Sequence, residues 1–259
     1  MPLTTIEWHQ RFTQQTHWTS ALRHYILQKT QLIDSDWILE VGSGTGALLS
    51  ALQSAFSPDA TKHHFGLDIN KPFLQYSRNQ LPDVKLTQGD GHHLPYHNAS
   101  FDAVTCHFLL LWVHNPGLLL EEMARVTRPN GYVIAFAEPD YGGRIDYPLE
   151  LVEIGKLQTM SLKQQGADTN LGRKLAGLFS NAGLTNIEFG ILGGQWDKND
   201  IEDANQSEWA MIKDDLNGLI SNARIDQLRQ LDFTAQSEGA RVLFIPTFYA
   251  YGQVPDLSK

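Results

Sequence analysis

This 259-residue chain has a single cysteine, no long apolar run and no opening segment that resembles a signal peptide. The one cysteine, Cys106, excludes a disulfide within the chain and favours a reducing, cytoplasmic setting. The longest strongly apolar stretch, FLLLWV at 108–113, is far shorter than the roughly 18 residues of a membrane span. The opening MPLTTIEWHQRF has no basic start followed by an apolar core, so no signal peptide is predicted.

Positive charge is also scarce and is not clustered anywhere. The formal net charge is −9, and such an acidic surface repels phosphate backbones, which disfavours a nucleic-acid partner. The ten histidines are spaced in ways that match no zinc signature, and a lone cysteine supplies no set of thiolates. The sequence therefore predicts no metal site and no nucleic-acid partner, and it leaves the oligomeric state open.

An alternation of apolar strands with helices occupies the middle of the chain. Such alternation implies a parallel sheet with helices on both faces. Strands are predicted at 37–41, 64–68, 84–88, 103–106, 132–137, 187–192 and 242–254, with helices at about 45–56, 71–80 and 116–127. Pro246 argues for an edge position or a bulge in the last strand. The fold class expected is α/β, a Rossmann-like, doubly wound and mostly parallel sheet of seven strands.

Two further parts flank this predicted sheet domain, which spans 37–259. Residues 1–36 read as a helical leader or cap, broken near Gln15 to Trp18. The strand–helix rhythm stops after residue 138, and helices are predicted at 149–165, 171–181 and 200–232. These helices place lid segments at about 139–175 and 195–235, over the end of the sheet where ligands of such folds bind.

The segment ILEVGSGTGALL, residues 38–49, carries the strongest functional signal. It joins an apolar strand to a helix through a turn with glycine at alternate positions, and such a turn lets backbone N–H groups approach a ligand. The spacing G-x-G-x-G differs from the G-x-G-x-x-G of dinucleotide-binding folds. Glu40, in the last residues of the strand, places a carboxylate there that suits a cationic ligand better than a pyrophosphate.

This run and several later motifs resemble those of the class I S-adenosylmethionine-dependent methyltransferases. EVGSGTG at 40–46 matches the family's first motif, and Asp68 ends the second strand 22 residues after Gly46. GDGH at 89–92, SFDAV at 100–104 and EEMARVTRPNG at 121–131 follow in the family's order, with Asn130 in place of a frequent glycine. The resemblance covers roughly 37–138 and is nearest to the small-molecule, quinone-biosynthesis-like branch (methyltransferase type 11).

The resemblance implies S-adenosylmethionine as the cofactor and assigns residues to it. An acidic residue at Asp68 would take the ribose hydroxyls, and an aspartate at Asp90 would accept from the adenine amino group. Trp18 and Arg23 of the leader would close the site, the arginine pairing with the methionine carboxylate. The cofactor-binding candidates are Glu40, Gly42, Ser43, Gly44, Gly46, Asp68, Ile69, Gly89, Asp90, Gly91, His107, Trp18 and Arg23.

The activity that the resemblance implies is direct, in-line methyl transfer to a small-molecule acceptor of unknown identity. His107, one residue beyond the fourth strand, is the candidate catalytic residue, because histidine titrates near neutrality. Candidates for the acceptor pocket lie in the first lid segment, at Asp140, Tyr141, Arg144 and Arg173. Two alternatives stay open, namely a non-catalytic S-adenosylmethionine-binding or scaffold protein and an NAD-dependent oxidoreductase.

Overall fold

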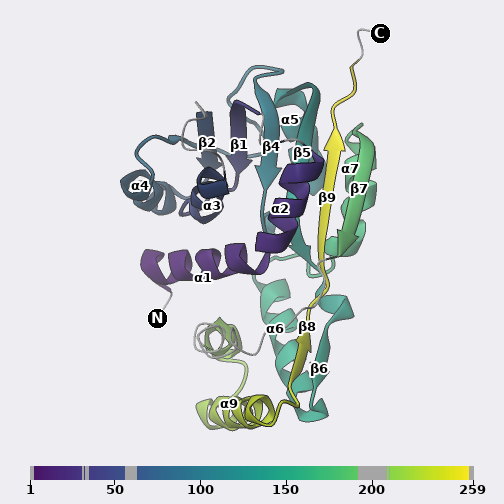
Figure 1. Cartoon of the computed structure of the whole chain (residues 1–259). Coiled ribbons are helices and arrows are strands. Elements are labelled where there is room, and N and C mark those ends of the chain that lie inside the picture. The colour runs from purple at the N-terminus through teal and green to yellow at the C-terminus, as the bar shows by residue number, and fades with distance from the viewer. Residues whose placement is uncertain are drawn as a thin grey trace.

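A seven-stranded sheet forms the body of the molecule in the computed structural model, which describes residues 3–30, 32, 35–55, 63–191, 209 and 211–256 (Figure 1). In sheet order the strands are β3 (Lys85–Gln88), β2 (His63–Asp68), β1 (Trp37–Val41), β4 (Phe101–Cys106), β5 (Thr127–Pro139), β9 (Thr247–Gln253) and β7 (Thr185–Ile191). All neighbouring strands pair in parallel except β9, which is antiparallel to both β5 and β7. The mostly parallel, doubly wound sheet is thus confirmed.

The prediction for the C-terminal strand is wrong in two respects. Residues 242–254 form two strands, β8 (Val242–Phe244) and β9, which are separated at Pro246. β9 also lies inside the sheet rather than at its edge, between β5 and β7. Proline is tolerated because it stands in the crossing between two sheets, where no ladder hydrogen bond is required of it.

Helices cover both faces of the sheet, as the alternation of strand side chains requires. One face packs against α2 (Ser20–Lys29) and α3 (Ala47–Ala55), with Ile38, Ile134 and Phe136 from the strands in its core. The other packs against α5 (Pro116–Val126) and α7 (Leu175–Asn181) through Leu39, Val104 and Val133. Among the described residues, no helix has both the length and the apolar composition needed to cross a membrane.

Local capping explains where several helices begin. Asn70 accepts a hydrogen bond from Phe73 N and starts α4 (Lys71–Gln80), which has proline in its first turn. Thr4 and Glu7 form a reciprocal capping box at the start of α1 (Thr5–Trp18). The leader is broken at Thr19, one residue beyond the predicted break, and α2 then continues along the sheet.

The lid elements form a smaller unit with a core of its own. β6 (Ile145–Tyr147) pairs antiparallel with β8 beside η4 (Leu149–Leu151), α6 (Val152–Gln164) and α9 (Asn222–Ser237). Their buried side chains, including Leu151, Trp209 and Leu228, form a separate cluster. In Figure 1 the strands β1 and β4 point toward α1, which runs across their ends, and the lid lies on the far side of α1. The start of the lid segment predicted at 195–235 and the first part of the helix predicted at 200–232 lie outside the described residues.

Candidate cofactor site

The glycine turn after β1 takes the conformation that its sequence predicts. Gly42, Gly44 and Gly46 have φ values of 72°, 51° and 83°, a region that side chains with a Cβ rarely adopt. Gly42 N and Ser43 N donate to Leu67 O at 2.7 and 3.0 Å, which draws the turn against the end of β2. A Cβ at Gly42 would lie 2.6 Å from Leu109 Cδ1, so space as well as backbone angle requires glycine there.

Asp68 connects this turn to the end of β2. Its Oδ2 accepts from Gly44 N at 2.7 Å and its Oδ1 accepts from Asn70 N at 2.7 Å. Burial raises the pKa of Asp68, although the amides of Asn70 and Gly44 oppose that shift. Each carboxylate oxygen keeps a lone pair for a further donor. The neighbouring Ile69 is 70% exposed, so its side chain is open to contact by a ligand.

Glu40 is a buried carboxyl group that has no ion-pair partner among the described residues. The residue is 2% exposed, and its Oε2 has no hydrogen-bond partner within the described chain. Burial raises the pKa of Glu40 well above its usual range, and the nearby Asp68 adds to the shift. An uncompensated buried carboxyl group is costly to the free protein, which makes Glu40 a candidate to meet a cationic ligand.

The predicted turn at Gly89–Gly91 lies beside Asp68. Gly89 N donates to Asp68 O at 3.0 Å, which brings the ends of β2 and β3 together. Asp90 is exposed, and its Oδ1 accepts from His92 N at 2.9 Å and pairs with His92 Nδ1 at 2.8 Å. The His92 amide and then its ring lower the pKa of Asp90. Its second oxygen has no hydrogen bond among the described residues.

The leader places Arg23 and Thr19 at the end of β4. Arg23 is 7% exposed and donates to Thr16 O at 2.9 Å; the described residues give its guanidinium no carboxylate partner. Thr19 Oγ1 lies 3.1 Å from His107 Nε2.

A cavity of about 260 Å³ lies between α1, α2 and α3. It is lined by Arg23, His9, His17, Thr13, Thr16 and Ser50, with Ala47 and Ala51. Trp18 is nearly half exposed and does not line this cavity.

His107 is neutral at ordinary pH. Burial, and then the nearby Arg23 charge, lower the pKa of His107 to about 3. The hydrogen bond to Thr19 holds one ring nitrogen, and the ring of Phe108 packs edge-on against the imidazole. A histidine with so low a pKa is a weak proton acceptor, and it can line a ligand pocket without carrying charge.

The four predicted acceptor residues fall into two separate groups. Asp140, 2% exposed, pairs with Arg173 through Arg173 Nε at 2.5 Å and Nη2 at 2.6 Å. Burial disfavours ionisation of Asp140, but Arg173 outweighs it and the pKa of Asp140 falls below its usual value. Tyr141 begins the 3-10 turn η3 (Tyr141–Gly143), and its N–H donates to Thr169 O. The structure therefore brings Asp140, Tyr141 and Arg173 together beyond the end of β5.

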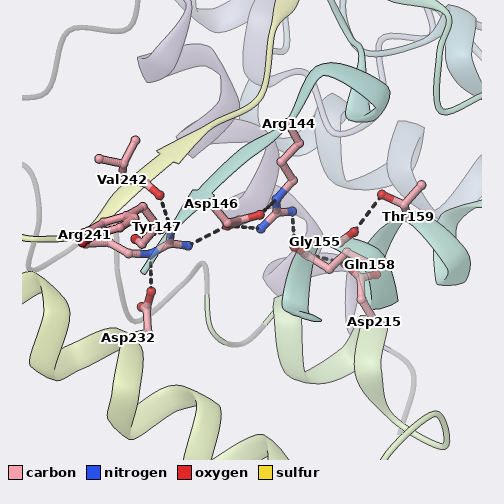
Figure 2. A network of polar contacts seen from close by, with 10 residues as sticks. All are labelled: Arg144, Asp146, Tyr147, Gly155, Gln158, Thr159, Asp215, Asp232, Arg241 and Val242. Carbon is pink, nitrogen blue, oxygen red and sulfur yellow. Dashed lines mark hydrogen bonds and ion pairs between the residues drawn. The ribbon is translucent and has the colours of Figure 1, made fainter. Parts of the chain in front are cut away.

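Arg144 belongs instead to a buried ion-pair network inside the lid (Figure 2). It donates to Asp146 at 2.6 and 3.1 Å and to Gln158 Oε1 at 2.6 Å. Arg241 also pairs with Asp146, at 3.0 Å, and with Asp232, at 2.5 Å. The side chain of Arg144 is only 4% exposed, so its charge is committed to the lid rather than presented at a surface.

Glu138 was expected at this edge of the sheet but was assigned no role in binding, and it is the least exposed acidic group there. It follows the apolar part of β5, is 0% exposed and accepts from three backbone amides. Burial raises the pKa of Glu138 to about 8, although the hydrogen bonds from the amides of Leu110, Leu111 and Leu109 lower it. The only sequence signal is an acid that directly follows a buried strand.

Comparison with known proteins decides the family. A family model described as "Methyltransferase domain" matches residues 39–135. The demethylmenaquinone methyltransferase of Bacillus mycoides (strain KBAB4) is 34% identical over 168 residues, which cover 58% of this chain and 70% of that protein. This chain belongs to the class I S-adenosylmethionine-dependent methyltransferases. Its place is in their small-molecule branch, and its cofactor is S-adenosylmethionine.

Other matches to known proteins cover a smaller share of the matched protein. The demethylmenaquinone methyltransferase of Renibacterium salmoninarum is 32% identical over 126 residues, 48% of this chain and 51% of that protein. The chain thus spans about half the length of several curated relatives that it matches. Phosphoethanolamine N-methyltransferase 2 of Haemonchus contortus, solved with S-adenosyl-L-methionine, shares the fold, with a TM-score of 0.55, 14% identity and coverage of 85% of this chain and 49% of that one.

The residues at the sheet edge fit this cofactor. S-adenosylmethionine carries positive charge at its sulfonium and ammonium groups, and the turn offers the orphaned Oε2 of Glu40 and the raised-pKa carboxyl of Asp68. The cofactor's carboxylate has a possible counter-charge in Arg23. In the part of the chain that the structure describes, no group of three or more His, Cys, Asp or Glu side chains could hold a metal ion.

Proposed function

We propose that this protein transfers the methyl group of S-adenosylmethionine to a small-molecule acceptor. The observation that carries the proposal is the uncompensated carboxyl group of Glu40 beside a glycine turn whose three glycines all have positive φ. Charge of this sign at this place is what a sulfonium cofactor requires and what a pyrophosphate cofactor would oppose. The second alternative, an NAD-dependent oxidoreductase, is therefore disfavoured.

In this proposal each polar group at the edge binds one part of the cofactor. Asp68 accepts from the ribose hydroxyls with the lone pairs that Gly44 and Asn70 leave open. Asp90 accepts from the adenine amino group through Oδ2, while Gly89 and Gly91 allow close approach of the ring. Arg23 pairs with the methionine carboxylate, and Ile69 and Trp18 give the site apolar walls. Gly42, Ser43, Gly44 and Gly46 bring the backbone to the cofactor.

The bound cofactor supplies an already activated methyl group, so the protein's task is alignment and exclusion of water. His107 lines the pocket next to the leader and, with a pKa of about 3, is a poor general base at neutral pH. That property favours an acceptor whose nucleophile needs little deprotonation. The names of the relatives make demethylmenaquinone-like quinols a reasonable first class to assay.

The acceptor pocket is proposed between the end of β5 and the lid. Tyr141 and Arg173 support it best, since the Arg173 side chain is 53% exposed while Asp140 holds its inner edge. Arg144 is better placed to hold the lid together than to contact an acceptor.

We further propose that residues 1–36 act as a cap and the segments near 139–175 and 195–235 as a lid. The acidic charge and single buried cysteine support a cytoplasmic location and an acceptor other than nucleic acid.

The test begins with calorimetric titration of the protein with S-adenosylmethionine, S-adenosylhomocysteine and NADH. Saturable binding of the first two is expected, and no heat at high micromolar S-adenosylmethionine would overturn the proposal. Transfer of a labelled methyl group is then followed across a metabolite panel that includes quinols. Binding with no transfer to any acceptor would favour the non-catalytic alternative, and binding of NADH alone would favour an oxidoreductase.

A further inference from the structure

The carboxylate of Glu138 is held entirely by the backbone of one loop. Its Oε1 accepts from Leu109 N at 3.0 Å and Leu110 N at 2.8 Å, and its Oε2 accepts from Leu111 N at 3.1 Å. These amides open the 3-10 turn η2 (Leu110–Trp112), whose first N–H groups have no partner within the turn. A fully buried acid that satisfies three successive amides fixes the path of that loop.

The same loop reaches both sides of the cofactor site. Phe108, just before it, has a φ of 49°, and its N–H donates to Ala137 O at 2.9 Å on the strand that carries Glu138. Leu109, the first residue that Glu138 holds, lies against Gly42, where an added Cβ would be 2.6 Å from Leu109 Cδ1 and 2.9 Å from Cδ2. His107 stands immediately before Phe108. Movement of this loop would therefore displace the wall of the glycine turn.

We propose that Glu138 is a positioning residue for the cofactor site, acting through Leu109 on the glycine turn at Gly42. The inference rests on the proposed function, because it assumes that the turn holds the cofactor. Glutamate is needed because both oxygens accept. A glutamine keeps the size but offers one acceptor oxygen, and its NH₂ group would face a backbone N–H.

A matched pair of isosteric substitutions tests the proposal. Glu138→Gln is expected to weaken binding of S-adenosylmethionine by about tenfold, since the new NH₂ group cannot accept from a loop amide and at least one of the hydrogen bonds that hold the loop is lost. Glu122→Gln is the control. Glu122 also accepts from a backbone amide, that of Leu94 at 2.8 Å, and pairs with Arg125, but it has no hydrogen bond to any residue that the proposal assigns to the cofactor. This control is expected to bind the cofactor as the wild type does.

A merely structural role for Glu138 is separated from positioning by a double-mutant cycle. Leu109→Ala removes the side chain that contacts Gly42 and is also expected to weaken cofactor binding by about tenfold. If Glu138 acts through Leu109, the double variant loses less affinity than the sum of the two single losses. Calorimetry with S-adenosylmethionine gives the affinities, and chemical denaturation gives the stability of each variant.

The outcomes separate the inference from the proposed function. Folded Glu138→Gln that binds like the wild type, or losses that add fully in the double variant, would overturn the inference. If Glu138→Gln does not fold, Leu109→Ala decides, and its unchanged affinity would have the same consequence. Failure of the wild type itself to bind S-adenosylmethionine would overturn the proposed function and the inference with it.

Discussion

Buried charged side chains form ion pairs in the lid, but the buried acids at the sheet edge that carries the candidate cofactor site do not. In the lid, Asp146 is paired with both Arg144 and Arg241, and Arg241 also reaches Asp232 (Figure 2). Asp232 in turn accepts from Trp209 Nε1 at 2.7 Å. At the sheet edge, Glu40 and Glu138 are as deeply buried, yet they have no ion pair in the described part of the chain, and burial raises the pKa of both.

The difference separates a structural use of charge from a ligand-binding one. Buried ions that neutralise one another can hold a small unit in one arrangement, and losing one member leaves the others unpaired. Buried acids without partners destabilise the free protein, and a cationic ligand relieves that cost. The lid network therefore stabilises the protein's own structure, and Glu138 holds a loop through backbone amides. Glu40 is the edge carboxyl group that has an unpartnered oxygen among the described residues, and we expect it to meet the cofactor.

The largest expected effect comes from breaking the lid network. Asp146→Ala leaves two arginine side chains buried without their shared carboxylate, because Arg144 and Arg241 are 4% and 9% exposed. The free energy of unfolding is expected to fall by about 3–5 kcal/mol in urea denaturation. Glu153→Ala, which breaks the exposed pair with Arg224, is the control and should cost under about 1 kcal/mol. Equal losses for the two variants would contradict the comparison.

The next effect separates affinity from stability at the sheet edge. Glu40→Gln removes the uncompensated carboxyl, so cofactor affinity should fall by about 10- to 100-fold, as expected for a lost charged contact. Because burial raises the pKa of Glu40 in the folded state, its ionisation costs stability as pH rises above the unfolded value near 4.5. At pH 7 the variant should thus be at least as stable as the wild type. A loss of both affinity and stability would show that Glu40 is a structural acid.

Cofactor binding should release protons. The positive charges of S-adenosylmethionine favour the ionised form of Glu40, whose pKa in the free protein is raised by burial and by Asp68. The titratable groups that interact with it are Asp68 on β2 and the buried thiol of Cys106 on β4. Calorimetry at pH 7 in buffers of different ionisation enthalpy should give a binding enthalpy that becomes more negative as the buffer's ionisation enthalpy rises, because the buffer takes up the released protons.

Two ligands sharpen this prediction. S-adenosylhomocysteine lacks the sulfonium charge and should release fewer protons than S-adenosylmethionine, and Glu40→Gln should reduce the difference. A binding enthalpy independent of buffer for both ligands would contradict proton-linked binding.

The smallest expected effect concerns a third acid, on the surface. Glu188 accepts from Tyr25 at 2.6 Å, Tyr251 at 2.7 Å and Tyr249 at 3.3 Å, which ties the leader helix α2 to β7 and β9. Tyr25→Phe should reduce the free energy of unfolding by about 0.5–1 kcal/mol, because the hydrogen bond is exposed to water. Thermal and urea denaturation measure it. A loss as large as that of Asp146→Ala would mean that leader docking depends on this hydroxyl.

Much of the sheet follows from local pattern. The apolar run at 37–41 is β1 to the residue, and β2, β3 and β4 are present with shifts of one or two residues at their ends. β5 begins five residues earlier and ends two residues later than predicted. The position of β9 does not follow, because its pairing with β5 and β7 depends on contacts across more than 55 residues of sequence. Pro246 predicted an edge position or a bulge, because a crossing between two sheets leaves the same local signal.

The site divides in the same way. The turn at Gly42–Gly46 could be predicted, because positive φ selects glycine and the spacing is specific. The contacts of Glu138 could not be predicted, because its partners are the backbone amides of three leucines, and any residue type has such an amide. The lid pairing of Arg241 with Asp146 joins residues 95 apart and has no local signature. Nothing in the sequence indicated that Arg144 binds Asp146 and Gln158 inside the lid.

The placement of β9 has a consequence for how the chain is made. Every other strand of the sheet precedes Thr247–Gln253 in sequence, yet this strand occupies the position between β5 and β7. During synthesis β5 and β7 therefore emerge with their facing edges unpaired, and the sheet closes only when the final strand enters between them. Until that moment the nascent protein exposes strand edges on which other chains can pair.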